Sequence, residues 1–309
     1  MDKRAALPLF TIYLLLAVAV QPVSAHGGEG ESLWSSWSLD PLVLPGILLA
    51  GLIYMRGWKV ITQRGSKPGL PRWKRWSFFS GLLILLIALV SPLDALADQL
   101  FSAHMVQHTL LMMVAPPLLV LGLPLPPLLL GLPRRLQMGL GRVWKTFPGL
   151  HRFWQAASRP MIVWLAQAAV LWGWHAPVLY TASVENDTVH ALQHISFLGS
   201  ALLFWWVVLN TYGANLEQRG TGVLYLFITA LQSGLLGALI TFSRTAWYPI
   251  YSDRAEEWGL TGLADQQLAG TIMWVPAGVI FLIAALSMLK PLLDSGPSEE
   301  GMAPQKELK

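Results

Sequence analysis

The chain has 309 residues, of which 54% are hydrophobic and 12% are charged, and it contains no cysteine. An average soluble domain carries about 25% charged residues, so this composition excludes a disordered chain and favours a membrane protein with several spans. The lack of cysteine excludes a disulfide scaffold and any zinc or iron–sulfur site built on thiolate ligands.

The N-terminal segment has the three parts of a secretory signal. A basic start precedes an apolar run over about 5–20, and Ala25 closes a stretch of small residues. This pattern predicts a signal peptide over 1–25, with an uncleaved signal anchor as the alternative. The Gly-rich residues 26–37 are then expected to form an extracytoplasmic tail.

Seven later segments are each long and apolar enough to form a membrane span, which needs about 20 mostly apolar residues. Their apolar residues lie on all sides, as expected of helices that contact lipid or one another. The predicted fold class is therefore an all-α polytopic membrane helix bundle with about seven transmembrane helices over 38–290. A disordered cytoplasmic tail over 291–309 is expected to follow. The predicted spans are 38–56, 76–92, 101–122, 159–177, 188–210, 221–243 and 266–289.

The segment 109–133 interrupts this pattern because it contains six prolines. Proline lacks a backbone donor, and its ring clashes with the preceding turn of a helix. We expect a kinked third span that ends near Gly122 and is followed by a stretch along the membrane interface. A re-entrant segment is the alternative.

The basic residues give the orientation of the spans. When successive loops are assigned to alternate sides, 17 of the 21 basic residues fall on one side and only Arg244 and Arg254 on the other. The positive-inside rule makes the basic side cytoplasmic. This places the mature N-terminus outside, in agreement with the secretory signal, and the C-terminus inside. The basic clusters adjoin the spans, where contact with anionic membrane lipids explains them, and no nucleic-acid-binding motif is present.

Five histidines fall at one predicted depth, near the outer face. His104 and His108 begin the third span, His190 and His194 begin the fifth, and His175 lies near the outer end of the fourth. Both pairs have the pattern H-x-x-Q-H, and a spacing of four residues places two imidazoles on one face of a helix.

These histidines, together with Met112 one turn further along the third span, are interpreted as a metal site. Imidazole binds copper, zinc and iron, thioether sulfur favours Cu(I), and ionisable residues inside a bilayer usually mark function. Hydrogen bonding between helices is the structural alternative. Axial ligation of a haem is a further alternative.

Other polar residues at this depth are candidates for orienting the imidazoles, with helix capping as the alternative role for the carboxylates. His26 could chelate copper through its imidazole and a new N-terminal amine, although a flexible tail is the simpler interpretation. The sequence has no hydrolytic triad, phosphate-binding glycine loop or H-E-x-x-H helix, so nothing requires an enzyme. The accessory candidates are Asp94, Asp98, Gln107, Gln193 and Asp265.

Three stretches are similar to motifs of a known family: Ser91–Leu118 with its H-M-V-Q-H and A-P-P-L motifs, His190–His194, and Asp265–Gly270. They resemble the CtaG family of caa-type cytochrome c oxidase assembly factors over about 75–290. The resemblance implies a multi-span membrane protein, distinct from the single-span copper chaperone of the same name. It also implies a role in maturing a haem–copper oxidase, at the step of copper insertion.

The leading hypothesis is therefore a non-enzymatic assembly factor in a bacterial plasma membrane. It would hold copper near the outer face and pass it to an oxidase subunit. Its acidic outer rim would attract the cation or a copper-donor protein. The alternatives are a haem-binding membrane cytochrome, a copper transporter and a scaffold without metal. A transporter usually needs polar groups at the bilayer midplane or on both sides, which the sequence does not show.

Overall fold

The computed structural model describes residues 36–38, 41, 43–63, 70–122, 124–212 and 218–294. The predicted signal peptide, His26 and the tail beyond 294 lie outside the described residues. Within the described part the regular structure is entirely helical, which confirms the predicted all-α class.

Six helical segments are long and apolar enough to cross a membrane, and a seventh candidate is a pair of helices that meet at an angle of 72°. This confirms a polytopic bundle of about seven spans. The last helix, α15, continues to Asp294 and so includes the first four residues of the predicted C-terminal tail. The six segments are α2 (Val43–Gln63), α3 (Arg72–Val90), Phe101–Leu121, Asp187–Asn210, α13 (Arg219–Thr241) and residues Gly262–Lys290 of α15 (Gly262–Asp294).

The fourth span differs from the predicted straight helix over 159–177. Helix α10 (Pro160–Trp174) has 15 residues, which reach only about 22 Å at 1.5 Å per residue. The chain then bends at His175 and continues as α11 (Pro177–Glu185). The bend follows from Pro177, because proline donates no backbone hydrogen bond and disfavours a helical conformation in the residue before it.

The third span is continuous, but it changes its helical geometry in the middle. Helix α5 (Phe101–Thr109) leads into a π-helical turn, η2 (Leu110–Val114), and then into α6 (Ala115–Leu121). The span ends one residue before the predicted Gly122.

The missing N–H of a proline accounts for this π-helical turn. Pro116 lacks the N–H that would bond the Met112 carbonyl in an α-helix, and Ala115 instead donates to Leu110, five residues earlier. The indole of Trp205, on α12 (Asp187–Trp206), donates to the Met112 carbonyl at 3.0 Å. The carbonyl therefore keeps a partner, and the span remains a helix.

After Gly122 the chain turns back and forms α7 (Leu125–Gly131), which packs against α2. This contact is close because it uses glycine on both sides. A Cβ at Gly57 would overlap the Pro127 carbonyl, and a Cβ at Gly131 would overlap the Ile53 carbonyl. The segment after the third span is thus a packed helix and differs from the predicted interfacial stretch.

Two further helices lie in the basic loop before the fourth span: α8 (Arg134–Thr146) and α9 (Pro148–Ala157). None of the residues of α8 is buried, and its apolar Leu136 and Met138 are exposed alongside basic residues. A helix with this composition is typical of a membrane surface.

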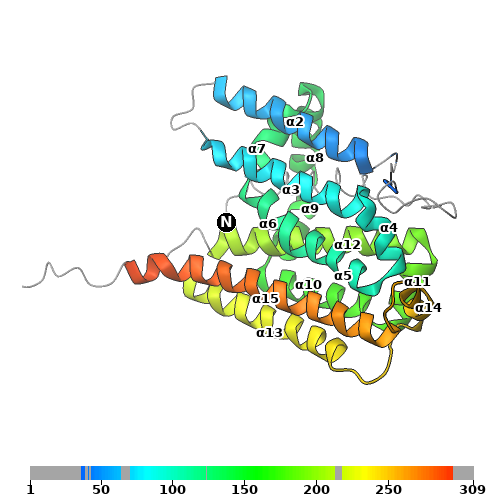
Figure 1. The fold of residues 1–309 in the computed structure, drawn as a ribbon. Helices are drawn as coiled ribbons and strands as arrows, with labels where there is room; N and C mark the ends of the chain where they lie inside the picture. The colour runs from blue at the N-terminus through cyan, green and yellow to red at the C-terminus, as the bar shows by residue number, and fades with distance from the viewer. Residues whose placement is uncertain are drawn as a thin grey trace, which may run out of the picture.

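Short helices cover one end of the bundle, here termed the covered end (Figure 1). Side chains tie this layer to the spans. The Arg254 guanidinium donates to the Asp98 carbonyl at 2.7 Å, and the Tyr248 hydroxyl donates to the His175 carbonyl at 2.7 Å. The covering elements are α4 (Pro92–Gln99), α11, η5 (Pro249–Tyr251) and α14 (Ser252–Glu257).

Candidate metal centre

The structure brings all five predicted histidines into one cluster beneath the covered end. Within α5 and within α12 the two ring centroids are 4.2 Å apart, as the four-residue spacing predicts. Between the helices, His104 lies 5.4 Å from His190, and His108 lies 5.5 Å from His194. His175, at the bend after α10, extends the cluster with its ring 6.5 Å from that of His108.

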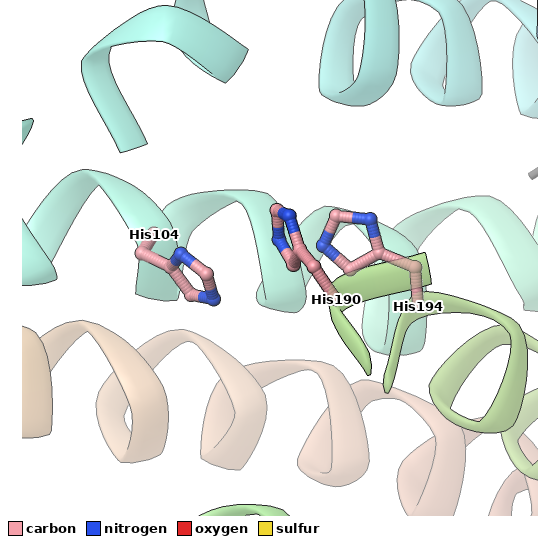
Figure 2. A group of neighbouring side chains, drawn as sticks. All are labelled: His104, His190 and His194. Atoms are coloured by element: carbon pink, nitrogen blue, oxygen red, sulfur yellow. The ribbon is translucent and has the colours of Figure 1, made fainter. Parts of the chain in front are cut away.

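Three of these residues form a compact donor group. His104, His190 and His194 each offer a ring nitrogen, and these atoms lie within 4.8 Å of one another. Figure 2 shows the His104 ring of α5 opposite the two rings that α12 contributes. A tetrahedral ion with nitrogen ligands at about 2.0–2.1 Å requires nitrogens roughly 3.4 Å apart. Small rotations of these side chains would therefore close the group around one ion.

The imidazoles are buried, and their nitrogens are left without partners. His104, His108, His175 and His194 are each at most 5% exposed, whereas His190 is partly exposed. The Nε2 atom of every one of the five has no hydrogen bond within the described structure. Buried polar atoms are nearly always satisfied, and each unsatisfied one costs about 1–3 kcal/mol. Coordination of a metal would satisfy these atoms.

A hydrogen bond at Nδ1 fixes the orientation of the His175 ring. Its Nδ1 lies 2.7 Å from the Leu171 carbonyl. A carbonyl can only accept, so Nδ1 carries the proton, and in the neutral ring Nε2 holds the free lone pair. Such a bond on the distal nitrogen is typical of histidines that bind metals.

An aromatic layer separates the cluster from the surface of the covered end. Phe101, Tyr180 and Tyr248 pack with ring centroids 4.5–5.1 Å apart. The Tyr251 hydroxyl lies 3.4 Å from Nδ1 of His104 and 3.2 Å from the Tyr180 hydroxyl. Burial raises the pKa of Tyr251, although its bond to Tyr180 acts in the opposite direction. Its hydroxyl therefore stays protonated at neutral pH.

Sequence reasoning missed these tyrosines. The available signal was weak: Tyr248 and Tyr251 lie in the loop between the sixth and seventh predicted spans, on the same predicted side as the histidines. Only the fold shows that this loop turns inward over the cluster.

Three of the predicted accessory residues hold helix α5 in place. Asp265, on α15, accepts the backbone N–H groups of Phe101 at 2.7 Å and Ser102 at 3.1 Å, so it caps the first turn of α5. The Gln107 amide donates to the Asp94 carboxylate at 2.7 Å and to the Ala88 carbonyl at 2.8 Å. These bonds fix α5 against α15, α4 and α3.

The other predicted residues lie in different settings. Gln193 is fully buried beside His104. Asp98 is an exposed residue, and its backbone carbonyl accepts a hydrogen bond from Arg254. Met112 lines a cavity next to His108, beside the three-histidine group.

A family model described as cytochrome c oxidase caa3 assembly factor (Caa3_CtaG) matches residues 52–294. Similar curated proteins include uncharacterized proteins of Mycobacterium bovis and Mycobacterium tuberculosis, each 28% identical over 260 residues. Another is an uncharacterized protein of Mycobacterium leprae, 25% identical over 259 residues. Each match covers 81% of this chain but 38% of the relative, so the chain spans about two fifths of these proteins. No significant match to a solved structure was found.

Proposed function

Because the chain belongs to the family of cytochrome c oxidase caa3 assembly factors, we propose that it assists oxidase assembly by holding copper at the five-histidine cluster. The observation that carries the proposal is the burial of five histidine Nε2 atoms, none of which has a hydrogen-bond partner among the residues that the structure describes. A donor set of neutral imidazoles is well suited to copper. The chain would act as a carrier of the ion and not as an enzyme.

The arrangement suits a transient carrier. A group of three nitrogens leaves one tetrahedral position open, through which an ion can be received or transferred. His190 is the partly exposed member and offers an entry point. Acidic side chains at the covered end would attract a cation or a basic partner, such as a copper-donor protein or an oxidase subunit. These acidic residues are Glu185, Asp187, Asp253, Glu256 and Glu257.

The geometry favours a bare ion over the haem alternative. The rings of His104 and His190 stack at 5.4 Å with an interplanar angle of 25°. A porphyrin ligated by one histidine from each helix would have to separate these rings. We therefore expect the absorption spectrum of the purified protein to lack a Soret band, and a Soret band that shifts on reduction would favour the cytochrome hypothesis.

The test compares three proteins in detergent and in cells that lack the native gene. The double variant His104→Ala/His190→Ala removes one ligand from each helix, and His151→Ala is the matched control. His151 lies on α9 against Trp144, away from the cluster. We expect the double variant to lose bound copper and to leave the oxidase copper-deficient, and the control to behave like wild type. Equal copper content and equal oxidase activity in all three would contradict the proposal.

A further inference from the structure

A small cavity adjoins the histidine cluster, between the third span and helices α10, α13 and α15. Its volume is about 30 Å³, enough for one or two atoms the size of a water molecule. Four of the six lining side chains that can bind a metal are methionines. The side chains with metal-binding atoms are Met105, Met112, Met113, Met273, His108 and His175.

The helical register of the third span explains how three thioethers meet in one place. Met105 and Met112 are separated by seven residues, close to two full turns, and therefore share a face. Met113 would lie about 100° away in a regular α-helix, but the π-helical turn η2 includes both Met112 and Met113, and both line the cavity. Helix α15 contributes Met273 from the opposite wall. Turns of this kind occur frequently at functional sites.

The polar atoms of the cavity are available to a ligand. Both ring nitrogens of His108 and Nε2 of His175 are buried without hydrogen bonds within the described structure. The two hydroxyls in the wall cannot donate to them, because Thr109 donates to the Met105 carbonyl and Ser233 to the Thr229 carbonyl, each at 2.8 Å. The residues lining the cavity include no charged side chain.

We propose that this cavity is a second copper site, selective for Cu(I), with methionine sulfurs and the nitrogens of His108 and His175 as ligands. Thioether ligands select soft monovalent copper. A neutral, buried donor set also favours an ion of charge +1 over +2, because the cost of burying a charge rises steeply with its magnitude. His108 lines the cavity, and its ring lies 5.5 Å from that of His194, so it connects the cavity with the three-histidine group. The cavity would bind copper through its own ligands. This proposal therefore does not depend on copper binding at the three-histidine group.

The test uses Ag(I), a redox-inert substitute for Cu(I), and Cu(I) itself, with purified protein in detergent. The cavity variant is Met112→Leu/Met273→Leu, which removes two sulfurs but conserves side-chain volume, a change that cores tolerate. The control is Met138→Leu/Met161→Leu, because Met138 and Met161 are 62% and 66% exposed. A third protein, His104→Ala/His190→Ala, removes the histidine group but leaves the cavity intact.

We expect wild type and control to bind two Ag(I) ions, and the cavity and histidine variants to bind one each. Copper-edge X-ray absorption of the histidine variant loaded with Cu(I) should show sulfur scatterers. Unchanged Ag(I) stoichiometry and affinity in the cavity variant would overturn the proposal. Copper in the histidine variant without sulfur ligands would overturn it as well, and this readout does not depend on the folding of the methionine variant. If only the histidine variant lost oxidase assembly, this result would support the proposed function of the histidine cluster. It would neither support nor contradict the cavity site, which the Ag(I) stoichiometry and the X-ray absorption test.

Discussion

Asp265 acts on the candidate metal centre through the backbone of helix α5. Its carboxylate is completely buried and accepts the N–H groups of Phe101 and Ser102, which begin the helix. A negative charge at this position is also favoured by the helix dipole. His104 follows two residues later, so the carboxylate positions one of the three clustered histidines.

We therefore predict that Asp265→Asn lowers both stability and copper affinity. The amide retains one acceptor oxygen but points an NH₂ group toward a backbone donor, which leaves that donor unsatisfied at a cost of about 1–3 kcal/mol. Thermal unfolding in detergent and copper titration measure the two effects. The control for the stability measurement is Glu256→Gln, which removes a charge from an exposed position on α14. An Asp265→Asn variant as stable as this control would show that the cap is not needed.

At the residue scale, the sequence predicted the clustering of the histidines better than it predicted the residues that support them. The four-residue spacing within His104/His108 and His190/His194 is a local rule, and the ring distances within each helix follow it. The contact of Asp265 with Phe101 joins residues 164 positions apart. No periodicity within one helix encodes such a contact. The role of Tyr251 depends in the same way on how a distant loop folds over the cluster.

At the scale of elements, hydropathy located the spans but not their interruptions. Pro116 and Pro177 both lack an N–H, yet the first lies in a continuous helix with a π-helical turn and the second follows a bend of 72°. The difference lies in the surroundings, because Trp205 supplies the missing donor at the first site. A proline in the sequence therefore predicts that the helix is interrupted. Whether the interruption is a π-helical turn or a bend depends on the donors that the neighbouring helix supplies.

The contact between α2 and α7 gives a second prediction. In Gly131→Ala the added Cβ would overlap the Ile53 carbonyl, and a backbone atom cannot move aside as a flexible side chain can. We expect the two helices to separate and the free energy of unfolding to fall by about 1–3 kcal/mol, the usual cost of overpacking. Thermal unfolding in detergent provides the measurement.

The control for this change is Gly139→Ala on α8, where a Cβ would meet no atom within 4 Å. Alanine is favoured over glycine inside a helix by about 1 kcal/mol, so this variant should be as stable as wild type or more stable. If Gly131→Ala matched it, the packing of α7 on α2 would not contribute to stability.

At the scale of the whole molecule, the fold class and the gathering of the histidines at one end of the bundle were predictable from the positions of the apolar segments and of the histidines along the chain. Apolar segments of sufficient length identify spans, and spans that enter from the same side bring their first turns to one end of the bundle. This is why five histidines from three spans could be expected to meet. The covering layer of α4, α11, η5 and α14 was not predictable, since its short helices are fixed by contacts such as that of Arg254 with Asp98.

The orientation of the bundle remains a prediction, and the lack of cysteine makes it directly testable. The wild-type chain has no thiol, so a single introduced cysteine reports only its own position. The exposed Thr146, at the end of α8, and the exposed Glu256, on α14, are suitable sites. Because the loop assignment puts 17 basic residues on the side of α8 and only two on the side of the covered end, the positive-inside rule predicts that the covered end lies outside. In intact cells without an outer-membrane barrier, a membrane-impermeant maleimide should label Glu256→Cys but label Thr146→Cys only after lysis. The reverse pattern would place the histidine cluster at the cytoplasmic face, where exchange of copper with an extracytoplasmic donor would be excluded.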